Sequence, residues 1–342
     1  MHTQWQQFLT TNGATLDSQG QIQFNNLAEA QARITTNGAV CSLDHLGCIR
    51  ASGADAQTFL QGQLSNDINL LDNQHVQFSA YCNPKGRMMA QFLIVPDNQD
   101  FLLLLPRTIL EPTLKRLRMF VLRSQVVLTD TSDEIVCLGL AGSGIAGTIN
   151  KQLPDAEYDL TLSENVFISK LPAPIPRFLL LTDRAHAERL WQQLTPDLLG
   201  TDQHLWHWLD IQAGLPSIWP QTVEEFVPQM LNLELINGVN FNKGCYPGQE
   251  IVARMHYLGK PKRRMYHLTL DAGERPIPGT DLYVAGGDGQ SAGKVVLAEQ
   301  GSQGIECLAV LQNDKAPGEL RLGSVDGPKL TMDKLPYSLE SA

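Results

Sequence analysis

Positive charge is scarce in this sequence. Lys and Arg number 26 against 36 Asp and Glu over 342 residues, so the formal net charge is −10. A chain this acidic is not suited to coat nucleic acid or an anionic membrane non-specifically, although a local basic patch is compatible with it. Apolar residues make up 43% and charged residues 18%. This composition excludes intrinsic disorder and indicates a globular protein of two or three domains.

Cysteine pairs and long apolar runs are also missing. The six cysteines, at positions 41, 48, 82, 137, 245 and 307, form no Cys-x-x-Cys pair and have no zinc-finger spacing with histidine. The first residues lack the basic and apolar regions of a signal peptide, so we expect reduced thiols in a cytoplasmic protein. The most apolar stretch, residues 88–105, is interrupted by Pro96 and its polar neighbours. Each half therefore has the length of a strand and is too short to span a bilayer.

Strand and helix signals are mixed up to about residue 258. The first forty residues, rich in Gln and Asn, are expected to pack loosely, and residues 39–43 and 47–51 predict two strands around a turn. Further strands and helices predict an α+β body over residues 1–258, in two subdomains that divide near residue 145. Residues 259–342 carry short alternating runs separated by Gly, Pro and Asp, which predicts a small β-barrel. The further strands are predicted at 76–81, 87–95, 100–105, 125–129 and 135–140, and the helices at 54–64, 111–120, 183–194 and 202–213.

The segment with the strongest chemical signal is residues 243–250, Lys-Gly-Cys-Tyr-Pro-Gly-Gln-Glu. A helix is predicted to begin near Pro247, which places Cys245 just before a helix N-terminus. Free backbone N–H groups and the helix dipole stabilise a thiolate at such a position. We interpret Cys245 as a reactive thiolate or a metal-cluster ligand, and the other five cysteines as buried apolar residues. The candidate helpers of Cys245 are Lys243, which would hold the thiolate, and Gln249 and Glu250, which would shape the loop.

Residues 243–250 resemble the Lys-Gly-Cys-Tyr-x-Gly-Gln-Glu signature of the YgfZ family, folate-binding proteins linked to tRNA modification and to the maintenance of iron–sulfur enzymes. The resemblance implies an architecture like the T-protein of the glycine cleavage system, with a folate-binding α+β body of two related subdomains followed by a small β-barrel. It also implies a cavity in the body for a tetrahydrofolate derivative, with the Cys245 loop near it. Weaker matches extend the resemblance over most of the chain, at residues 61–63, 85–86, 211–216, 226–229 and 335–340.

The resemblance also implies folate-contacting residues. A folate needs a flat stacking surface for its pterin ring and cations for its glutamate tail. Trp206 falls at the edge of the apolar stripe of its predicted helix, a position that suits a pocket wall or a half-buried packing residue. Alignment with the family places folate-contacting tryptophans at Trp206 and at Leu46, where this chain has an aliphatic side chain without aromatic stacking. Arg254 is a candidate for an anionic group of the folate.

Whether the protein is an enzyme stays open. The T-protein enzymes use an aspartate in the strand after the glycine turn, but residues 82–96 contain no Asp or Glu. We therefore do not expect an aminomethyltransferase. The leading interpretation is a folate-binding accessory protein that supports iron–sulfur enzymes, including those that modify tRNA. The alternative is a folate-dependent one-carbon transferase that acts on an unknown acceptor.

Two further clusters leave alternatives open. Residues 243–264 carry six basic side chains against one acidic side chain. This basic cluster suits a solvated linker, an anchor for the folate tail or a contact with RNA phosphates. His204 and His207 lie three residues apart, one helical turn, on a predicted helix and could share a ligand. Two histidines alone do not define a metal site, and we assign none.

Overall fold

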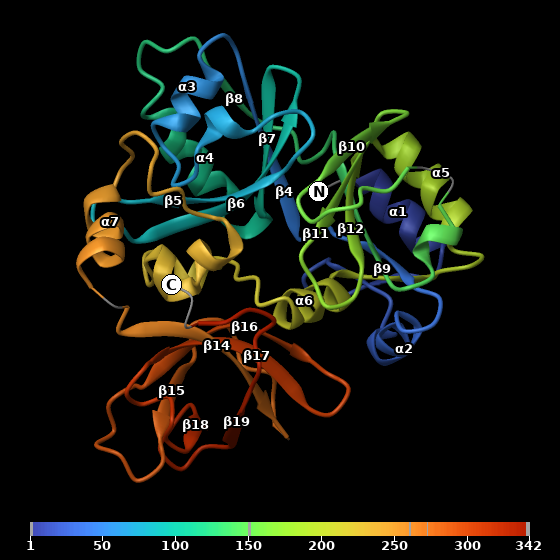
Figure 1. Cartoon of the computed structure of the whole chain (residues 1–342). Helices are drawn as coiled ribbons and strands as arrows, with labels where there is room; N and C mark the ends of the chain where they lie inside the picture. The colour runs from blue at the N-terminus through green and yellow to red at the C-terminus, as the bar shows by residue number, and fades with distance from the viewer. Residues whose placement is uncertain (1–2, 150–151, 260, 272, 340–342) are drawn as a thin grey trace.

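The structure is a computed structural model that describes residues 3–149, 152–259, 261–271 and 273–339. Figure 1 shows three parts: two mixed helix-and-sheet parts and a barrel, which meet around helix α6 (Gln203–Gln212). The predicted α+β fold with a C-terminal β-barrel is confirmed.

The first part is built on a five-stranded antiparallel sheet with the order β5-β6-β7-β4-β8. Helices α3 and α4 pack against β4, β7 and β8. The central strands are buried on both faces, which explains the continuous apolar run at residues 88–105. The elements of this part are β4 (Leu46–Ser52), α3 (Ala56–Gln61), η1 (Ile68–Leu70), β5 (Gln77–Cys82), β6 (Met88–Asp97), β7 (Asp100–Pro106), η2 (Arg107–Ile109), α4 (Leu110–Arg118) and β8 (Val127–Asp130).

The second part is built on a six-stranded sheet with the order β10-β11-β12-β9-β3-β13, in which β13 pairs parallel to β3. Strands β3 and β9 precede residue 145 and the other four follow it, so the two sheets are interleaved along the chain. The subdomain limits near residues 145 and 258 stay predictions. The elements are β3 (Ala39–Ser42), β9 (Val136–Ala141), η3 (Ile145–Gly147), β10 (Leu160–Ser163), β11 (Val166–Leu171), β12 (Arg177–Thr182), α5 (Arg184–Leu194) and β13 (Leu199–Thr201).

Strands β3 and β4 do not pair with each other, although the sequence suggests two strands around a turn. Strand β3 lies between β9 and β13 in one sheet, and β4 lies between β7 and β8 in the other. All four positions of β3 are buried, so its residue pattern contains no information about its partner. The connection between the two strands crosses from one sheet to the other and brings His45 to their junction.

The expectation that the first forty residues pack loosely is wrong. Helix α1 (Thr3–Thr11) packs with α5 on the six-stranded sheet, and its Trp5 side chain is 1% exposed. The Trp5 ring lies 6.0 Å from that of Trp191, and its Nε1 donates to Ser42 Oγ at 3.1 Å. A few buried side chains thus fix a segment of mostly polar composition. The segment also contains β1 (Thr15–Leu16), β2 (Ile22–Gln23) and α2 (Leu27–Arg33).

The last part is a closed barrel with the order β14-β17-β16-β15-β18-β19 and its own apolar core. It docks on α6 through β16 and β17, where Glu306 accepts hydrogen bonds from Trp208 Nε1, at 2.8 Å, and from Gln212. Its strands are β14 (Arg263–Leu270), β15 (Asp281–Val284), β16 (Gly293–Gln300), β17 (Ile305–Gln312), β18 (Leu320–Leu322) and β19 (Lys329–Asp333). The segment between α6 and the barrel contains η4 (Pro220–Thr222), η5 (Pro228–Leu231), η6 (Leu233–Ile236) and α7 (Gln249–Leu258).

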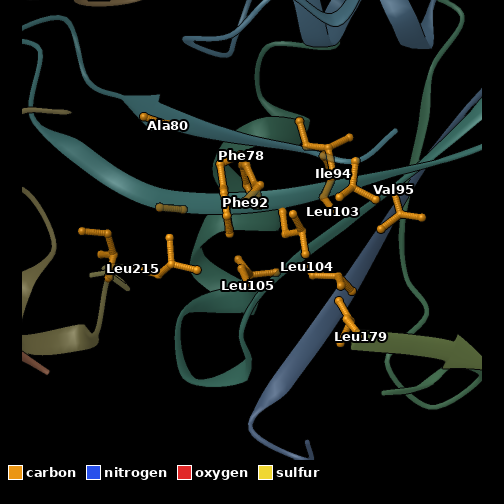
Figure 2. Packing of buried hydrophobic residues seen from close by; sticks show 14 of the residues in the cluster. Phe78, Ala80, Phe92, Ile94, Val95, Leu103, Leu104, Leu105, Leu179 and Leu215 are labelled. Carbon is orange, nitrogen blue, oxygen red and sulfur yellow. The ribbon is translucent and has the colours of Figure 1, made fainter. Parts of the chain in front are cut away.

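One apolar core joins the two sheet-containing parts. In Figure 2, Phe78, Phe92 and Leu104 of the five-stranded sheet belong to the same cluster as Leu179 of β12 and Leu215, which follows α6. The two parts therefore present their inner faces to a common junction.

Candidate functional site

Two adjoining cavities lie at the junction of the sheets, α6 and the barrel. The larger has a volume of about 350 Å³ and the smaller about 70 Å³. His45, His207, Trp219 and Leu297 line both of them. Together they have the size of a small-molecule binding site.

The smaller cavity brings together two of the three residues predicted to contact folate, Leu46 and Trp206. Leu46 begins β4 and Trp206 lies on α6, yet both line this cavity together with Phe78 and Leu93. The distant segments meet because β4 and α6 approach the junction from different parts. What either side chain does toward a folate stays a prediction.

Trp206 is more enclosed than a position at the edge of the apolar stripe suggests. It is 3% exposed, and the Arg177 guanidinium lies 4.8 Å from its ring centroid. A Cβ at Gly139 would lie 2.5 Å from Trp206 Cε3, so glycine on β9 is what allows the indole to approach the sheet this closely. Trp206 is thus a fixed wall of the cavity with little free ring surface.

Trp219 is the aromatic residue that the sequence analysis missed. It is half-buried, lines both cavities and contacts His207 edge to face at 5.5 Å. Its Nε1 is buried without a hydrogen-bond partner among the described residues. Trp219 lies in no α-helix or strand, so the spacing of apolar residues along a helix could not point to it. The available signal was its position shortly after the matched run at 211–216.

A partly buried ion pair lies at the smaller cavity. Arg177 NH1 lies 2.7 Å from Asp210 Oδ1, and the Arg177 side chain is fully buried. Burial raises the pKa of Asp210, and the positive charge of Arg177 opposes that shift. Asp210 is also in the cavity lining, so a charged acceptor group reaches an otherwise largely apolar space.

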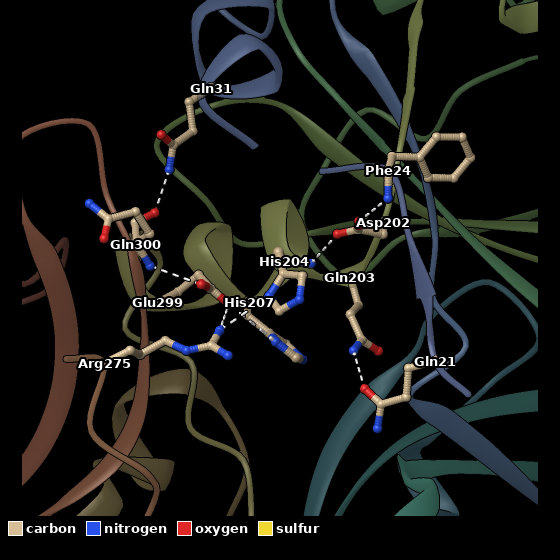
Figure 3. Close-up of polar contacts among 10 residues, drawn as sticks. All are labelled: Gln21, Phe24, Gln31, Asp202, Gln203, His204, His207, Arg275, Glu299 and Gln300. Carbon is tan, nitrogen blue, oxygen red and sulfur yellow. Dashed lines mark hydrogen bonds and ion pairs between the residues drawn. The ribbon is translucent and has the colours of Figure 1, made fainter. Parts of the chain in front are cut away.

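The lining of the larger cavity includes two arginines and three histidines, among them Arg107, Arg275 and His45. Figure 3 shows Glu299 of β16 between His204 and Arg275, with its Oε2 at 2.7 Å from His204 Nδ1 and 2.6 Å from Arg275 NH1. Burial favours the neutral acid at Glu299, but the hydrogen bond with His204, the nearby His207 imidazole and the positive charge of Arg275 outweigh it and hold the pKa of Glu299 well below its usual value. The hydrogen bond to Glu299 raises the pKa of His204, whereas burial and the neighbouring His207 hold the pKa of His45 well below its usual value.

The same residues include a group with metal-ligand chemistry. Donor atoms of His204, His207 and Glu299 lie within 4.8 Å of one another. The sequence analysis assigned no metal here because Glu299 lies far from the two histidines along the chain. Arg275 NH1 lies 3.2 Å from His204 Nδ1 as well as against Glu299, so a guanidinium already supplies the positive charge at this point. His204 of α6, Glu299 of β16 and Arg275 thus form a polar link between α6 and the barrel, which we call the latch. We assign no metal to it.

The Cys245 loop, residues 241–249, is held against the turn between β5 and β6. Gly248 has φ = 81°, and a Cβ on it would lie 2.5 Å from the Asn83 carbonyl oxygen and 2.6 Å from Gly86 Cα. Two glycines from separate family-like motifs therefore touch backbone to backbone, which a side chain at Gly248 would prevent.

Lys243 anchors this loop. Its Nζ donates to the carbonyl oxygens of Gln61, at 2.6 Å, of Leu64, and of Asn66, at 3.0 Å. An ammonium group has three hydrogens, and these carbonyls use all three. The sequence analysis assigned Lys243 to hold the Cys245 thiolate, but no N–H of Lys243 is left for it. Burial lowers the pKa of Lys243 to about 8.

The thiol itself is on the surface. Helix α7 begins at Gln249, slightly later than predicted, and Cys245 is exposed in the loop before it. Gln249 Nε2 donates to the carbonyl oxygens of Lys243, at 3.3 Å, and Gly244, at 3.4 Å, and so closes the loop. Glu250 is exposed in the first turn of α7. The other five cysteines are buried.

Three of the weaker family-like matches, residues 61–63, 85–86 and 226–229, lie around the same loop. Gln229 Nε2 donates to the Val252 carbonyl oxygen at 2.6 Å, and the Phe226 carbonyl oxygen accepts from Met88 N at 2.7 Å. Residues 61–63 supply a carbonyl acceptor of Lys243, and residues 85–86 pack under Gly248. Three motifs that are distant in sequence therefore build one support for the Cys245 loop.

The Cys245 loop and the cavities are separate. Among the described residues, the lining of the two cavities includes none of 243–250 and does not include Arg254, which is exposed on α7. The cations in the cavity lining are Arg107 and Arg275 instead. The basic cluster at 243–264 does not form one exposed patch. Arg264 is buried against Glu234, whereas Lys262 and Arg263 are exposed. Lys260 lies outside the described residues.

Comparison with known proteins places this fold in the T-protein class. The family described as the GCVT N-terminal domain matches residues 4–167. The solved structure of the glycine cleavage system aminomethyltransferase T from Bartonella henselae superposes with a TM-score of 0.79, covering 97% of this chain and 96% of that one at 16% identity, which shows a shared fold.

Two relatives define the family more narrowly. The tRNA-modifying protein YgfZ of Photorhabdus laumondii is 36% identical over 306 residues, which cover 87% of this chain and 92% of that protein. The protein of the same name from Yersinia pseudotuberculosis is 34% identical over 320 residues, covering 91% and 96%. The chain belongs to the YgfZ family. In the described part of the chain, no helix is long and apolar enough to cross a membrane.

Proposed function

We propose that this chain binds a reduced folate in the joined cavities and acts as an accessory protein in tRNA modification. The observation that carries the proposal is the cavity itself, which gathers Leu46, Trp206 and Trp219 at the junction of the three parts. The printed name of the two relatives supports the role in tRNA modification.

The cavity residues fit a folate. The smaller cavity has apolar walls, and the buried Gln91 Oε1 and Trp219 Nε1 in the lining have no hydrogen-bond partners among the described residues. Such atoms are costly unless a ligand satisfies them. The larger cavity offers Arg107 and Arg275 to an anionic tail. A bound reduced folate would supply a one-carbon carrier; the chain's own residues bind and orient it.

We do not propose aminomethyl transfer. Strand β6 follows the glycine turn and presents Gln91 and Leu93 to the smaller cavity, so an amide and no carboxylate faces the ligand space from this strand. The alternative, a one-carbon transferase on an unknown acceptor, predicts turnover of methylene- or formyl-tetrahydrofolate by the pure protein. The accessory role predicts binding without turnover.

We further propose that Cys245 is the reactive thiol through which the protein supports iron–sulfur enzymes, including those that modify tRNA. Its exposure and its rigid support suit contact with a partner protein. Glu250 and Arg254, both exposed on α7, the helix that follows the loop, would belong to the same contact. Direct tRNA contact through Lys262 and Arg263 would show as an affinity that falls steeply with salt.

Intrinsic fluorescence tests the folate site. The wild type, Trp206→Ala, Trp219→Leu and the control Trp191→Phe, whose ring packs against Trp5, are titrated with 5-formyltetrahydrofolate. We expect saturable quenching in the wild type and control, and weaker binding in the two cavity variants. Equal affinity in all four proteins would contradict the site.

Complementation tests the thiol. In cells that lack the native protein, Cys245→Ser is expected to lose support for the iron–sulfur enzymes, measured as a fall in thiolated and methylthiolated tRNA nucleosides by mass spectrometry. Cys307→Ser, at a buried barrel position, is the control. Full tRNA modification with Cys245→Ser would rule out the proposed role of the thiol.

A further inference from the structure

The smaller cavity contains an unusual set of hydrogen-bond acceptors for an apolar space. Phe78, Leu93 and Leu104 form much of its wall, and the carboxylate of Asp210 and the amide of Gln91 are also in the lining. Acceptors placed in an apolar pocket fix the orientation of a ligand, because they pair only with a matching set of donors.

Asp210 is held in one position. Its Oδ1 lies 2.7 Å from Arg177 NH1, and Arg177 is itself fixed by a hydrogen bond from its Nε to the Pro172 carbonyl oxygen at 3.2 Å and by the Trp206 ring. Among the described residues, Oδ1 is the only carboxylate oxygen of Asp210 with a hydrogen-bond partner. Arg177 therefore orients the carboxylate and leaves Oδ2 free to accept.

Gln91 provides independent evidence for a missing donor. Gln91 lies on β6 and is 6% exposed. Its side-chain oxygen Oε1 nevertheless has no hydrogen-bond partner within the described residues. An unpaired buried acceptor is unfavourable, so this oxygen points to a ligand that donates a hydrogen bond.

The two ends of a folate differ in the chemistry that these acceptors require. The pterin ring carries an N–H and an amino group side by side in one plane, a donor pair that suits a carboxylate. The opposite end carries carboxylates, which suit Arg107 and Arg275 in the larger cavity. We propose that Asp210, oriented by Arg177, and Gln91 accept the hydrogen bonds of the pterin's amino edge, so that the pterin enters the smaller cavity and the glutamate tail stays in the larger one.

This inference rests on the proposed folate binding and makes it more specific. The ligand class becomes reduced folates with a 2-amino-4-oxo pterin. Asp210 and Gln91 become specificity-determining residues, and Arg177 becomes a positioning residue.

A ligand pair separates this inference from folate binding itself. Calorimetry measures the binding of 5-formyltetrahydrofolate and of its 2-desamino-2-methyl analogue, which lacks the amino donor. We expect the wild type to bind the amino form at least about 10-fold more tightly, since a site built around a polar group rejects an analogue that lacks it.

Variants then locate the discrimination. Asp210→Asn is expected to bring the affinity ratio of the two ligands close to 1, and Gln91→Leu to reduce it. Asp202→Asn, at the N-cap of α6 and outside the lining of both cavities, is expected to keep the wild-type ratio. The wild-type measurement does not depend on whether Asp210→Asn folds.

The outcomes are distinct. If the wild type binds both ligands equally, or if Asp210→Asn keeps the wild-type ratio, this inference is overturned while folate binding stands. If the wild type binds neither ligand, the proposed function fails and this inference fails with it.

Discussion

The cavity and the Cys245 loop differ in whether their polar groups have hydrogen-bond partners. In the cavity lining, Gln91 Oε1 and Trp219 Nε1 lack hydrogen-bond partners among the described residues. In the loop, Lys243 satisfies three carbonyls and Gln249 closes the chain on itself. Unpaired groups are suited to a ligand that completes them, whereas fully paired groups fix the position of one exposed side chain.

This difference indicates two sites that act separately. Among the described residues, no residue of 243–250 lines the cavities, and different elements support the two regions. Changes in the loop should therefore leave folate affinity intact, and changes in the cavity should leave the thiol intact. The predictions below test this separation.

Thiol labelling should show the largest contrast. We expect iodoacetamide to modify Cys245 at least about 1,000-fold faster than any other cysteine, because a buried thiol reacts only after the structure opens. Burial raises the thiol pKa at Cys41, Cys48, Cys82, Cys137 and Cys307. Pulsed alkylation followed by peptide mass spectrometry gives the six rates. Comparable labelling of Cys82 would contradict the buried assignment, and a rate at Cys245 that changes with saturating folate would couple the two sites.

Gly248→Ala should strongly destabilise the loop. The new Cβ would meet the Asn83 carbonyl oxygen at 2.5 Å in a left-handed backbone conformation, so we expect a loss of about 2–4 kcal/mol in the free energy of unfolding. Urea denaturation measures it. Gly244→Ala is the matched control because nothing lies within 4 Å of its Cβ, and a change within about 0.5 kcal/mol is expected. Similar free energies of unfolding for the two variants would refute the close packing of Gly248 on Gly86. Loss of folate affinity in folded Gly248→Ala would refute the separation of the two sites.

The sequence predicted the structure well where a residue pattern is compatible with only one kind of element. Alternating runs separated by turn residues predicted the barrel, and the octapeptide identified the one exposed cysteine of the six. The pairing of β3 was not predictable, because a strand buried on both faces has no polar side to set its partner. The packing of Trp5 was hidden by the polar composition around it.

The cavity was only partly predictable for a related reason. Trp206 and Leu46 came from a resemblance, while Trp219, Arg177 and Asp210 depend on elements that meet only in the folded chain. The role assigned to Lys243 illustrates the limit. Its closeness to Cys245 in sequence suggested a partner for the thiolate, but tertiary contacts direct its ammonium to the carbonyls of residues 61–66.

Trp219→Leu should weaken folate binding about 10-fold, since it removes an aromatic surface that lines both cavities. Fluorescence from the remaining tryptophans, or calorimetry, measures the affinity. The alkylation rate of Cys245 is expected to stay at the wild-type value. Unchanged folate affinity would remove Trp219 from the site. A lower alkylation rate of Cys245 would show that the cavity and the loop are coupled.

The smallest effect is expected at the latch between α6 and the barrel, and it depends on pH. Glu299 raises the pKa of His204, so the folded state favours the protonated imidazole. The stabilisation is then fully present below the unfolded histidine pKa of about 6.5 and is lost as the pH rises through the raised value. The pKa of Glu299 is lowered, so its contribution is present above the unfolded value of about 4.3 and is lost as the pH falls through the lowered one.

His204→Gln should therefore cost about 1 kcal/mol near pH 6 and less as the pH rises above the raised pKa of His204; Arg275 keeps the loss modest because it remains against Glu299. Urea denaturation at pH 6 and pH 9 measures the difference. His186→Gln, which removes an exposed pair with Asp183 on α5, is the control with a smaller effect. A cost that grows with pH would refute the charged latch. Because the latch borders the larger cavity, folate affinity should change in parallel with it, while the reactivity of Cys245 should not.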